Sequence, residues 1–181
     1  ILMIDDSTML IDSPANLLNE SNIFEIREPW MNIEVITPTD YYGPIMELVT
    51  KRRGEFKGQE YPAPHRVQLN YVIPLSELIV DFFDELKSRT KGYASLDYHF
   101  AEYRPDKLQK LEILVNGEPV DALASIVHEK EAYHKGQRFI TKLRKIIPRQ
   151  LFEVAIQASS GGRIISRANV KATRKDVLAK C

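Results

Sequence analysis

The chain has 181 residues, of which 44% are hydrophobic and 28% are charged. This length allows one ordinary domain or two small ones, and the composition excludes collagen-like and strongly disordered chains. Twenty-five basic residues balance twenty-five acidic ones, but the charge is unevenly distributed. Residues 1–127 have 12 Lys and Arg against 21 Asp and Glu, whereas residues 128–181 have 13 against 4, a net charge of +9. This asymmetry predicts a basic binding surface in the C-terminal part.

The single cysteine, Cys181, cannot form an internal disulfide. No run of about 18 apolar residues, the length that crosses a membrane, is present. The chain begins at Ile1 inside an apolar pattern and ends directly after another one at residues 177–179. We therefore expect a fragment of a longer protein.

Residues 1–28 are predicted to be the end of a preceding domain followed by a linker. Apolar residues at 1–3 and 9–11 flank the turn-forming Asp5-Asp6-Ser7, a pattern typical of a hairpin. Residues 12–22 are rich in turn formers, as linkers are. We place the boundary to the next domain near Arg27-Glu28-Pro29.

Residues 29–106 have strands at regular intervals. Met31, Ile33 and Val35 alternate with polar residues, which predicts a half-buried strand. Two further strands are expected at 55–61 and 66–73, joined by a loop that contains Pro62 and Pro64. A last strand is expected from residue 93 to residue 103.

Two helices are expected between these strands. Thr39 or Asp40 is predicted to cap the first helix, Pro44 lies in its first turn, and Gly54 is expected in left-handed conformation at its end. The second helix is predicted over 75–89 and closed by Gly92. Its predicted inward residues are Leu75, Leu78, Ile79, Phe82, Phe83 and Leu86, with Asp81, Asp84 and Glu85 outside. The resulting order, β-α-β-β-α-β, predicts a ferredoxin-like domain in an α+β chain.

Residues 107–181 are predicted to form a second small α+β domain with hairpins packed on a helix. A strand ends at Asn116-Gly117, a strong hairpin signal. A helix over 136–147 ends at Pro148, and strands that begin at Phe152 and Ile164 are joined by a turn at 159–162. The predicted inward residues of the helix are Phe139, Ile140, Leu143, Ile146 and Ile147. A final helix is expected from Arg174 onward.

No catalytic, cofactor or metal site is predicted in this segment. His128-Glu129 begins like a zinc-binding motif, but His134 follows six positions later, so one helix face would not present both histidines. Residues 159–163 lack the context of a phosphate-binding loop. The carboxylates of the second helix of the ferredoxin-like part are expected to be a solvated face.

The basic residues are the remaining chemical signal. Lys and Arg bind phosphates, and their number here suits an RNA backbone, although a solvated basic face is the alternative for each residue. Few aromatic side chains lie among them, which favours contact with folded RNA over base stacking. The candidate RNA-binding residues are Arg138, Lys142, Arg144, Lys145, Arg149, Arg163, Arg167, Lys171, Arg174 and Lys175.

The arrangement of these candidates gives a structural criterion. Arg138, Lys142 and Lys145 share one helix side, and Arg163, Arg167 and Lys171 share one strand face if that strand is regular. If Arg138, Lys142, Arg163 and Arg167 lie on opposite faces, the RNA interpretation loses its physical basis.

Two motif blocks carry a family resemblance. The segment EVITPTDYYGPI at 34–45, followed by KRRG at 51–54, resembles the start of the last ferredoxin-like domain of translocation GTPases of the elongation factor G type. Residues 72–103 resemble its second half. Elongation factor G differs at residues 81–84 (DFFD) and 91–93 (KGY), where this chain is similar to LepA, also called elongation factor 4.

The second block is more specific. VNGEPVDALA at 115–124, IPRQ at 147–150 with Phe152, AIQA at 155–158, and residues 170–181 resemble the C-terminal domain peculiar to LepA. Elongation factor G has no counterpart to residues 107–181. The resemblance covers the chain loosely before Arg27 and specifically after it.

The resemblance implies a function for the parent protein. LepA proteins are ribosome-dependent GTPases, thought to move tRNAs back by one codon, to assist ribosome assembly or to support translation under stress. Their GTP- and magnesium-binding G domain lies outside this chain, so no catalytic residue is transferred. A Lys-rich tail is expected after Cys181. The alternative is a ferredoxin-like protein- or ligand-binding module without RNA affinity.

The resemblance also implies partners and a location. Residues 29–106 would lie against the RNA and proteins of the large ribosomal subunit, with Lys51, Arg52 and Arg53 as docking residues, and residues 107–181 would reach the A-site tRNA. A cytoplasmic monomer is expected, without integral membrane contact but able to associate peripherally with the cytoplasmic face of a bacterial membrane.

Overall fold

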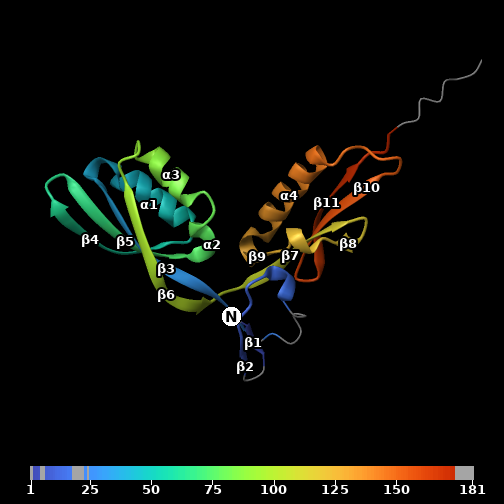
Figure 1. Ribbon diagram of the computed structural model, residues 1–181, viewed down its shortest axis with the longest axis horizontal. Helices are drawn as coiled ribbons and strands as arrows, with labels where there is room; N and C mark the ends of the chain where they lie inside the picture. Colours follow the sequence, from blue (N-terminus) through green and yellow to red (C-terminus); the bar gives the residue numbers. More distant parts are fainter. Residues whose placement is uncertain (1, 5–6, 18–22, 24, 174–181) are drawn as a thin grey trace, which may run out of the picture. The chain divides into compact units, whose positions relative to one another are not determined.

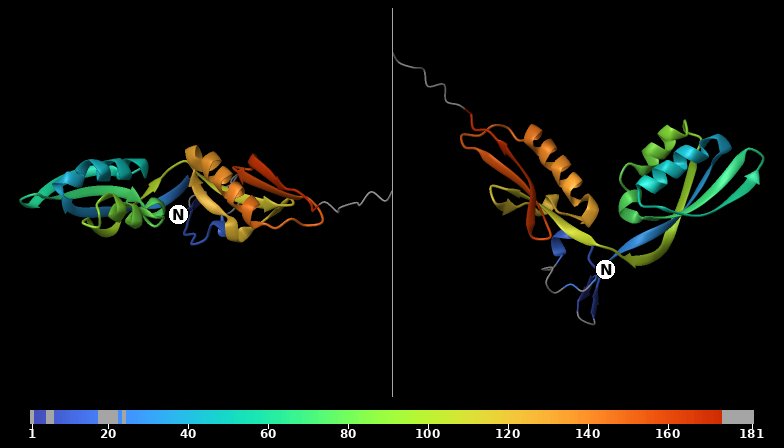
Figure 2. Two further views of the ribbon diagram at one scale, coloured as in Figure 1. Left: turned by 90° about the horizontal axis from the view of Figure 1, so that it is seen from above. Right: turned by 180° about the vertical axis from the view of Figure 1, so that it is seen from behind.

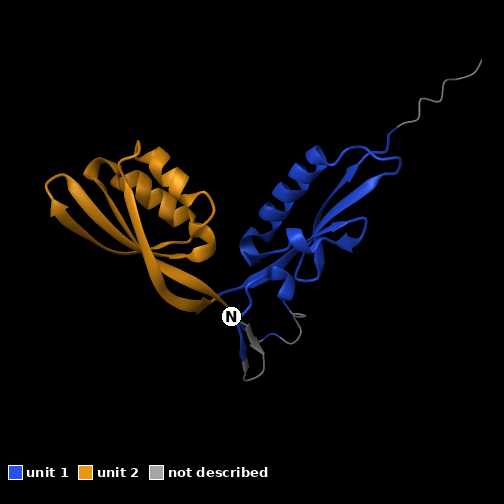
Figure 3. Cartoon of the chain, in the orientation of Figure 1, with its two compact units in different colours: residues 1–26, 106–181 blue, residues 27–105 orange. Residues whose placement is uncertain are grey.

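The computed structural model describes residues 2–4, 7–17, 23 and 25–173 (Figure 1). The chain divides into two compact units, residues 27–105 and residues 1–26 with 106–181 (Figure 3). Residues 1–28, predicted to end a preceding domain, are thus grouped mostly with the C-terminal part of the chain. The assignment of 1–28, 29–106 and 107–181 as domains stays a prediction.

The N-terminal segment forms the predicted hairpin. Strands β1 (Leu2–Ile4) and β2 (Ser7–Met9) pair antiparallel, and β1 also pairs with the start of β3 (Glu25–Pro38), where Leu2 lies opposite Ile26. A short 3-10 helix over Pro14–Asn16 follows in the segment predicted as a linker.

The unit of residues 27–105 has the predicted ferredoxin-like fold. Its strands are β3, β4 (Glu55–Ala63), β5 (Arg66–Pro74) and β6 (Ser95–Pro105), in the antiparallel order β6-β3-β5-β4. The helices are α1 (Tyr42–Lys51), α2 (Leu75–Leu78) and α3 (Phe82–Arg89). The β-α-β-β-α-β order is confirmed.

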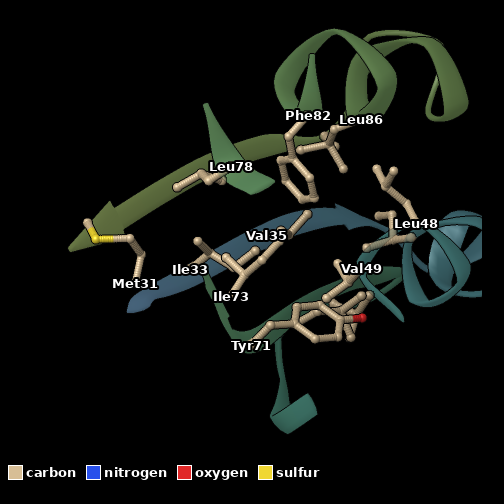
Figure 4. Packing of buried hydrophobic residues seen from close by; sticks show 14 residues of the cluster. Met31, Ile33, Val35, Leu48, Val49, Tyr71, Ile73, Leu78, Phe82 and Leu86 are labelled. Carbon is tan, nitrogen blue, oxygen red and sulfur yellow. The ribbon is translucent and has the colours of Figure 1, made fainter. Parts of the chain in front are cut away.

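The core of this unit follows from strand alternation. Ile33 and Val35, at 1% and 0% exposure, point from β3 toward the helices, as their period of two predicts. Leu48 from α1 and Phe82 from α3 pack onto the same face of the sheet (Figure 4). Burial of these apolar side chains is the main stabilising contribution.

The ends of α1 differ from the prediction. Neither Thr39 nor Asp40 caps the helix by a side-chain hydrogen bond, because residues 39–41 form a 3-10 turn that leads into it, and Tyr41 occupies the N-cap position. Pro44 lies in the first helical turn, as predicted. The left-handed residue after the helix is Arg53, with φ 59°, and not Gly54.

Gly54 instead allows its backbone to pass close to Val49. A Cβ atom there would lie 2.2 Å from Cγ1 of Val49 and 2.9 Å from the Val49 carbonyl oxygen. The Gly54 N–H donates to that oxygen at 2.9 Å, which requires the two backbones to be this close.

The predicted second helix is broken. It consists of α2 and α3, separated at residues 79–81, where Asp81 has a left-handed φ of 55°. The break rotates α3 relative to α2, so Ile79 and Phe83 are 71% and 51% exposed and the prediction that they point inward is wrong. Gly92 closes α3, and its N–H donates to the Lys87 carbonyl at 2.8 Å.

The loop predicted around Pro62 and Pro64 is shorter than expected. Pro62 lies within β4, which is an edge strand, and the pairing of β4 with β5 is irregular between Glu60 and Ala63. An edge strand tolerates proline because one side of its backbone needs no partner in the sheet. The turn itself contains Pro64 and His65, and His65 has φ 61°.

The second unit has the predicted hairpins packed on a helix. Strands β7 (Leu108–Val115), β10 (Val154–Ser160) and β11 (Arg163–Val170) form the order β11-β10-β7, and β8 (Glu118–Pro119) and β9 (Ser125–His128) pair with β7. Asn116 and Gly117, with φ 51° and 81°, form the predicted turn.

Helix α4 (Ala132–Ile146) lies over one face of this sheet (Figure 2). Gly136 makes that approach possible, because a Cβ atom there would lie 3.1 Å from the Cβ of Ala158. Ile140 is buried as predicted, but Phe139 and Ile146 are 36% and 74% exposed, so the prediction that they point inward is wrong.

Candidate nucleic-acid interface

A concavity of about 400 Å³ lies where the end of α4 meets the end of β11. Its lining residues are Arg144, Lys145, Ile147, Arg149, Asn169, Val170 and Lys171. Four of them are basic and all four are predicted RNA-binding residues. We call Arg144, Lys145, Arg149 and Lys171 the basic hollow.

Local sequence brings these four cations together. The Ile147 N–H donates to the Leu143 carbonyl at 2.8 Å, and Pro148 then prevents the helix from continuing. The chain turns back, and the Gln150 carbonyl accepts from the Thr173 N–H at 2.8 Å and from its hydroxyl at 3.2 Å. These hydrogen bonds tie the segment of Arg149 to the segment of Lys171.

The electrostatics of the basic hollow favour an anion. Within residues 25–173, none of its four side chains forms an ion pair, and all four are exposed. Arg144 and Lys145 occupy the last turn of α4, where the partial negative charge of the helix end offsets part of their mutual repulsion. Four unneutralised cations around one concavity can bind phosphate oxygens.

Helix α4 extends this basic surface. Arg138 and Lys142 are exposed on its outer side, away from the buried Gly136 and Ile140. Together with Lys145 they share that side, as the predicted spacing requires.

The strand residues do not share one face. Pairing of β10 with β11 shifts between Ala158 and Ser159, so Arg163 lies opposite Ser160 whereas Arg167 lies opposite Gln157. Ser160 shares the helix-covered face with buried Ala158, and Gln157 points to the other face. The prediction that Arg163 shares a face with Arg167 is wrong, because the extra residue in β11 reverses the alternation.

The four residues of the structural criterion therefore do not share one surface. Arg138 and Lys142 lie on the outer side of α4, and Arg167 lies on the opposite side of the sheet. The RNA interpretation on a shared surface of these four residues has therefore lost its physical basis. Of the predicted residues that the structure describes, Arg144, Lys145, Arg149 and Lys171 do meet, in the basic hollow, and Arg138 and Lys142 lie on the side of α4 that leads to it. Arg174, Lys175 and the predicted final helix lie outside the described residues.

The predicted docking residues serve mainly inside their own unit. Arg52 donates to Glu85 at 2.7 Å and to the Val80 carbonyl at 2.6 Å, and its side chain is only 16% exposed. Arg53 is bound by Glu28. Docking through these two arginines is therefore unsupported, because their terminal guanidinium nitrogens donate to internal acceptors. Lys51 is 63% exposed beside Glu47 and stays a predicted contact.

Exposed apolar residues near the basic hollow were not predicted. Ile146, Leu151 and Phe152 are 74%, 73% and 82% exposed. Phe152 was expected in a strand, but β10 begins only at Val154. Pro148 was the signal that could have predicted this exposure. Proline ends the helix, so the residues close to it in sequence lie in a turn.

The histidines do not assemble into a metal site. His128 lies 3.1 Å from Asp106 through Nε2, and its Nδ1 accepts from the Lys130 N–H at 3.2 Å. His134 is exposed beside Tyr133. Among the described residues, no group of three or more His, Cys, Asp or Glu could hold a metal ion, and no helix is long and apolar enough to cross a membrane.

Two family models match adjoining parts of the chain. Elongation factor G C-terminus matches residues 25–114, and GTP-binding protein LepA C-terminus matches residues 115–181. The chain belongs to the LepA family. The boundary between the two matched parts of this LepA chain falls within β7, so it differs from the boundary between the compact units.

Relatives named elongation factor 4 match over the same range. The protein of Lacticaseibacillus casei is 51% identical over 181 residues, which is 100% of this chain and 30% of the relative. That of Clostridium tetani is 55% identical over 174 residues, 96% of this chain and 29% of the relative. That of Cutibacterium acnes is 49% identical over 181 residues, again 100% and 30%. The chain thus spans about 30% of the length of these LepA proteins.

Proposed function

We propose that this chain is the ribosome- and tRNA-binding C-terminal part of a LepA-type translation GTPase. The observation that supports this most directly is the basic hollow, whose four exposed cations form no ion pair within residues 25–173 and belong to a protein of a translation-factor family. The ligand we propose for the basic hollow is the phosphate backbone of folded RNA, with the A-site tRNA as the expected partner.

The chemistry of the basic hollow favours backbone contact over sequence reading. Arginine presents a planar fork that matches phosphate oxygens, and lysine adds a compact charge. Such contacts position a protein on RNA without selecting a sequence. Because each neutralised phosphate releases counterions, the affinity will fall steeply as salt rises.

The activity of the whole protein is proposed from the family. The parent would bind GTP and magnesium in a G domain and move tRNAs back by one codon on the ribosome. We place it in the cytoplasm as a monomer. Peripheral membrane association stays an expectation from the resemblance alone.

Binding of the 181-residue chain to tRNA and to bacterial ribosomes, measured over a range of potassium chloride concentrations, tests the proposal. The hollow variant, R144Q/K145Q/R149Q/K171Q, removes the charge of the basic hollow. A matched control, R66Q/K91Q/K107Q/K130Q, removes four exposed charges that form no ion pair with described residues.

We expect steep salt dependence for the unmodified chain. For the hollow variant, the slope should be shallower by about 0.7–0.9 for each phosphate that the protein no longer neutralises. The control should keep its affinity within a small factor. Equal reductions of affinity in both variants would indicate attraction by overall charge only. Absence of any RNA or ribosome binding would favour the alternative, a ferredoxin-like binding module without RNA affinity.

A further inference from the structure

The break between α2 and α3 exposes an apolar surface. Ile79, Val80 and Phe83 are 71%, 55% and 51% exposed, although they lie close in sequence to the buried Leu78 and Phe82. We call residues 79–84 the α2–α3 turn. Clustered exposed apolar side chains beside polar ones are typical of protein interaction sites.

The turn is held rigidly in this exposed form. Nη1 of Arg52 donates to the Val80 carbonyl at 2.6 Å and to the Glu77 carbonyl at 3.2 Å, and Nη2 donates to Glu85 at 2.7 Å. One guanidinium therefore binds the residues on both sides of the break. Asp81 has a φ of 55°, a conformation that costs energy outside glycine. A surface that is already fixed in its binding conformation loses little conformational entropy when a partner binds.

The charges around the turn are acidic. Asp81 and Asp84 are exposed, and neither forms an ion pair with a described residue. The nearby Lys87 keeps its positive charge, since it donates to the neutral Ala94 carbonyl at 2.5 Å, and it lies 5.4 Å from the ring centre of Phe83. The two carboxylates without an ion pair to a described residue outnumber this one cation. Phosphates would be repelled here, whereas lysine and arginine side chains would be attracted.

We propose that the α2–α3 turn docks onto a basic protein that offers an apolar pocket beside Lys or Arg. This rests on the proposed function, because the partner would be a protein of the ribosome. RNA-binding proteins are rich in Lys and Arg, so ribosomal proteins supply the complementary charge. The turn therefore contacts ribosomal protein and the basic hollow contacts RNA.

Photo-cross-linking identifies the partner directly. Val80 is replaced by p-benzoylphenylalanine in the 181-residue chain, and a control chain has the same replacement at Tyr61, which is 63% exposed on β4. After irradiation with bacterial ribosomes, we expect an adduct at position 80 that resists ribonuclease and is destroyed by protease treatment. The control should give much less of it. An adduct that ribonuclease destroys, or an adduct between two copies formed without ribosomes, would overturn the proposal.

Affinity measurements separate the two interfaces. V80S/F83S and D81N/D84N should each weaken ribosome binding by about tenfold, as truncation of a central interface residue does, and leave tRNA binding unchanged. Asn at position 81 tolerates the left-handed backbone, so D81N/D84N should fold normally.

The outcomes distinguish failure of this inference from failure of the proposed function. If the hollow variant binds ribosomes weakly while V80S/F83S and D81N/D84N bind as the unmodified chain does, only the docking surface is overturned. If the unmodified chain binds no ribosomes, the proposed function fails and this partner fails with it.

Discussion

Arg53 donates from both terminal guanidinium nitrogens to the carboxylate of Glu28, at 2.7 and 3.1 Å, and thereby joins the residue after α1 to strand β3. Glu28 is only 8% exposed. The parallel pair of hydrogen bonds is the strong form of this interaction.

Arg53→Ala should lower the free energy of unfolding by about 3 kcal/mol, because it leaves the Glu28 carboxylate buried without its partner. Urea unfolding followed by the fluorescence of Trp30, the single tryptophan, measures the decrease. Lys51→Ala is the control, since the exposed pair of Lys51 with Glu47 contributes at most about 0.5 kcal/mol. Equal effects of the two substitutions would contradict a structural role for Arg53.

Gly54→Ala should destabilise the unit of residues 27–105 by about 2 kcal/mol, because the new methyl group would overlap the backbone and side chain of Val49. Gly43→Ala is the matched change, since a Cβ at Gly43 meets nothing within 4 Å. It lies in the first turn of α1 directly before Pro44, which disfavours helical backbone at a preceding residue with a Cβ atom and so offsets the better helix propensity of alanine, and it should change stability by less than about 1 kcal/mol. Thermal unfolding of both variants checks this, and equal melting temperatures would refute it.

The stability of the same unit should depend on the ionisation of Glu55. The hydrogen bond from Arg104 lowers the pKa of this carboxyl below its ordinary 4.5, despite partial desolvation, and Lys57 adds to the effect. A lowered pKa means that the carboxylate stabilises the folded state above pH 4.5 and that this stabilisation disappears as the pH falls through the lowered pKa.

Glu55→Gln should therefore make the free energy of unfolding less dependent on pH as the pH falls below 4.5. Arg104 lies over the Trp30 ring, 4.4 Å from its centre, so tryptophan fluorescence reports on this cluster. Glu60→Gln serves as control, since the exposed Glu60 forms no ion pair with described residues. An unchanged acid titration for Glu55→Gln would show that this pair contributes nothing.

Arg149→Gln should reduce the slope of tRNA affinity against salt by about one, as removal of one phosphate-binding cation does. The reduction should be the same for tRNAs of different sequence, because backbone contacts carry no sequence information. Arg163→Gln, at the other end of β11 from Lys171, should leave the slope nearly unchanged. A weakening limited to one tRNA would indicate base recognition instead.

Sequence periodicity predicted much of the architecture. The alternation of Met31, Ile33 and Val35 correctly located a half-buried strand, and Asn116-Gly117 correctly located a turn. Both signals are local, since a strand face and a two-residue turn depend on a few neighbouring residues. The basic character of residues 128–171 was likewise visible without the fold.

Local patterns did not reveal the break at residues 79–81. The helical spacing of apolar residues continues through it, and the backbone beside the left-handed Asp81 is bound by Arg52 from a distant part of the chain. In β11 one extra residue opposite Ser159 reversed the expected face of Arg163. No pattern within the strand itself marks that shift, because it depends on the partner strand.

The sequence by itself determined the β-α-β-β-α-β order of the ferredoxin-like unit apart from the break at residues 79–81, the family, and the excess of positive charge after residue 127, since these depend on residue identity and short spacings. Tertiary structure alone decided which cations remain available. Arg52 and Arg53 are neutralised by carboxylates far away in the chain, whereas Arg144, Lys145, Arg149 and Lys171 meet around one concavity without an ion pair among the described residues. Ion pairing and convergence both depend on distances in space, which spacing along the chain does not encode.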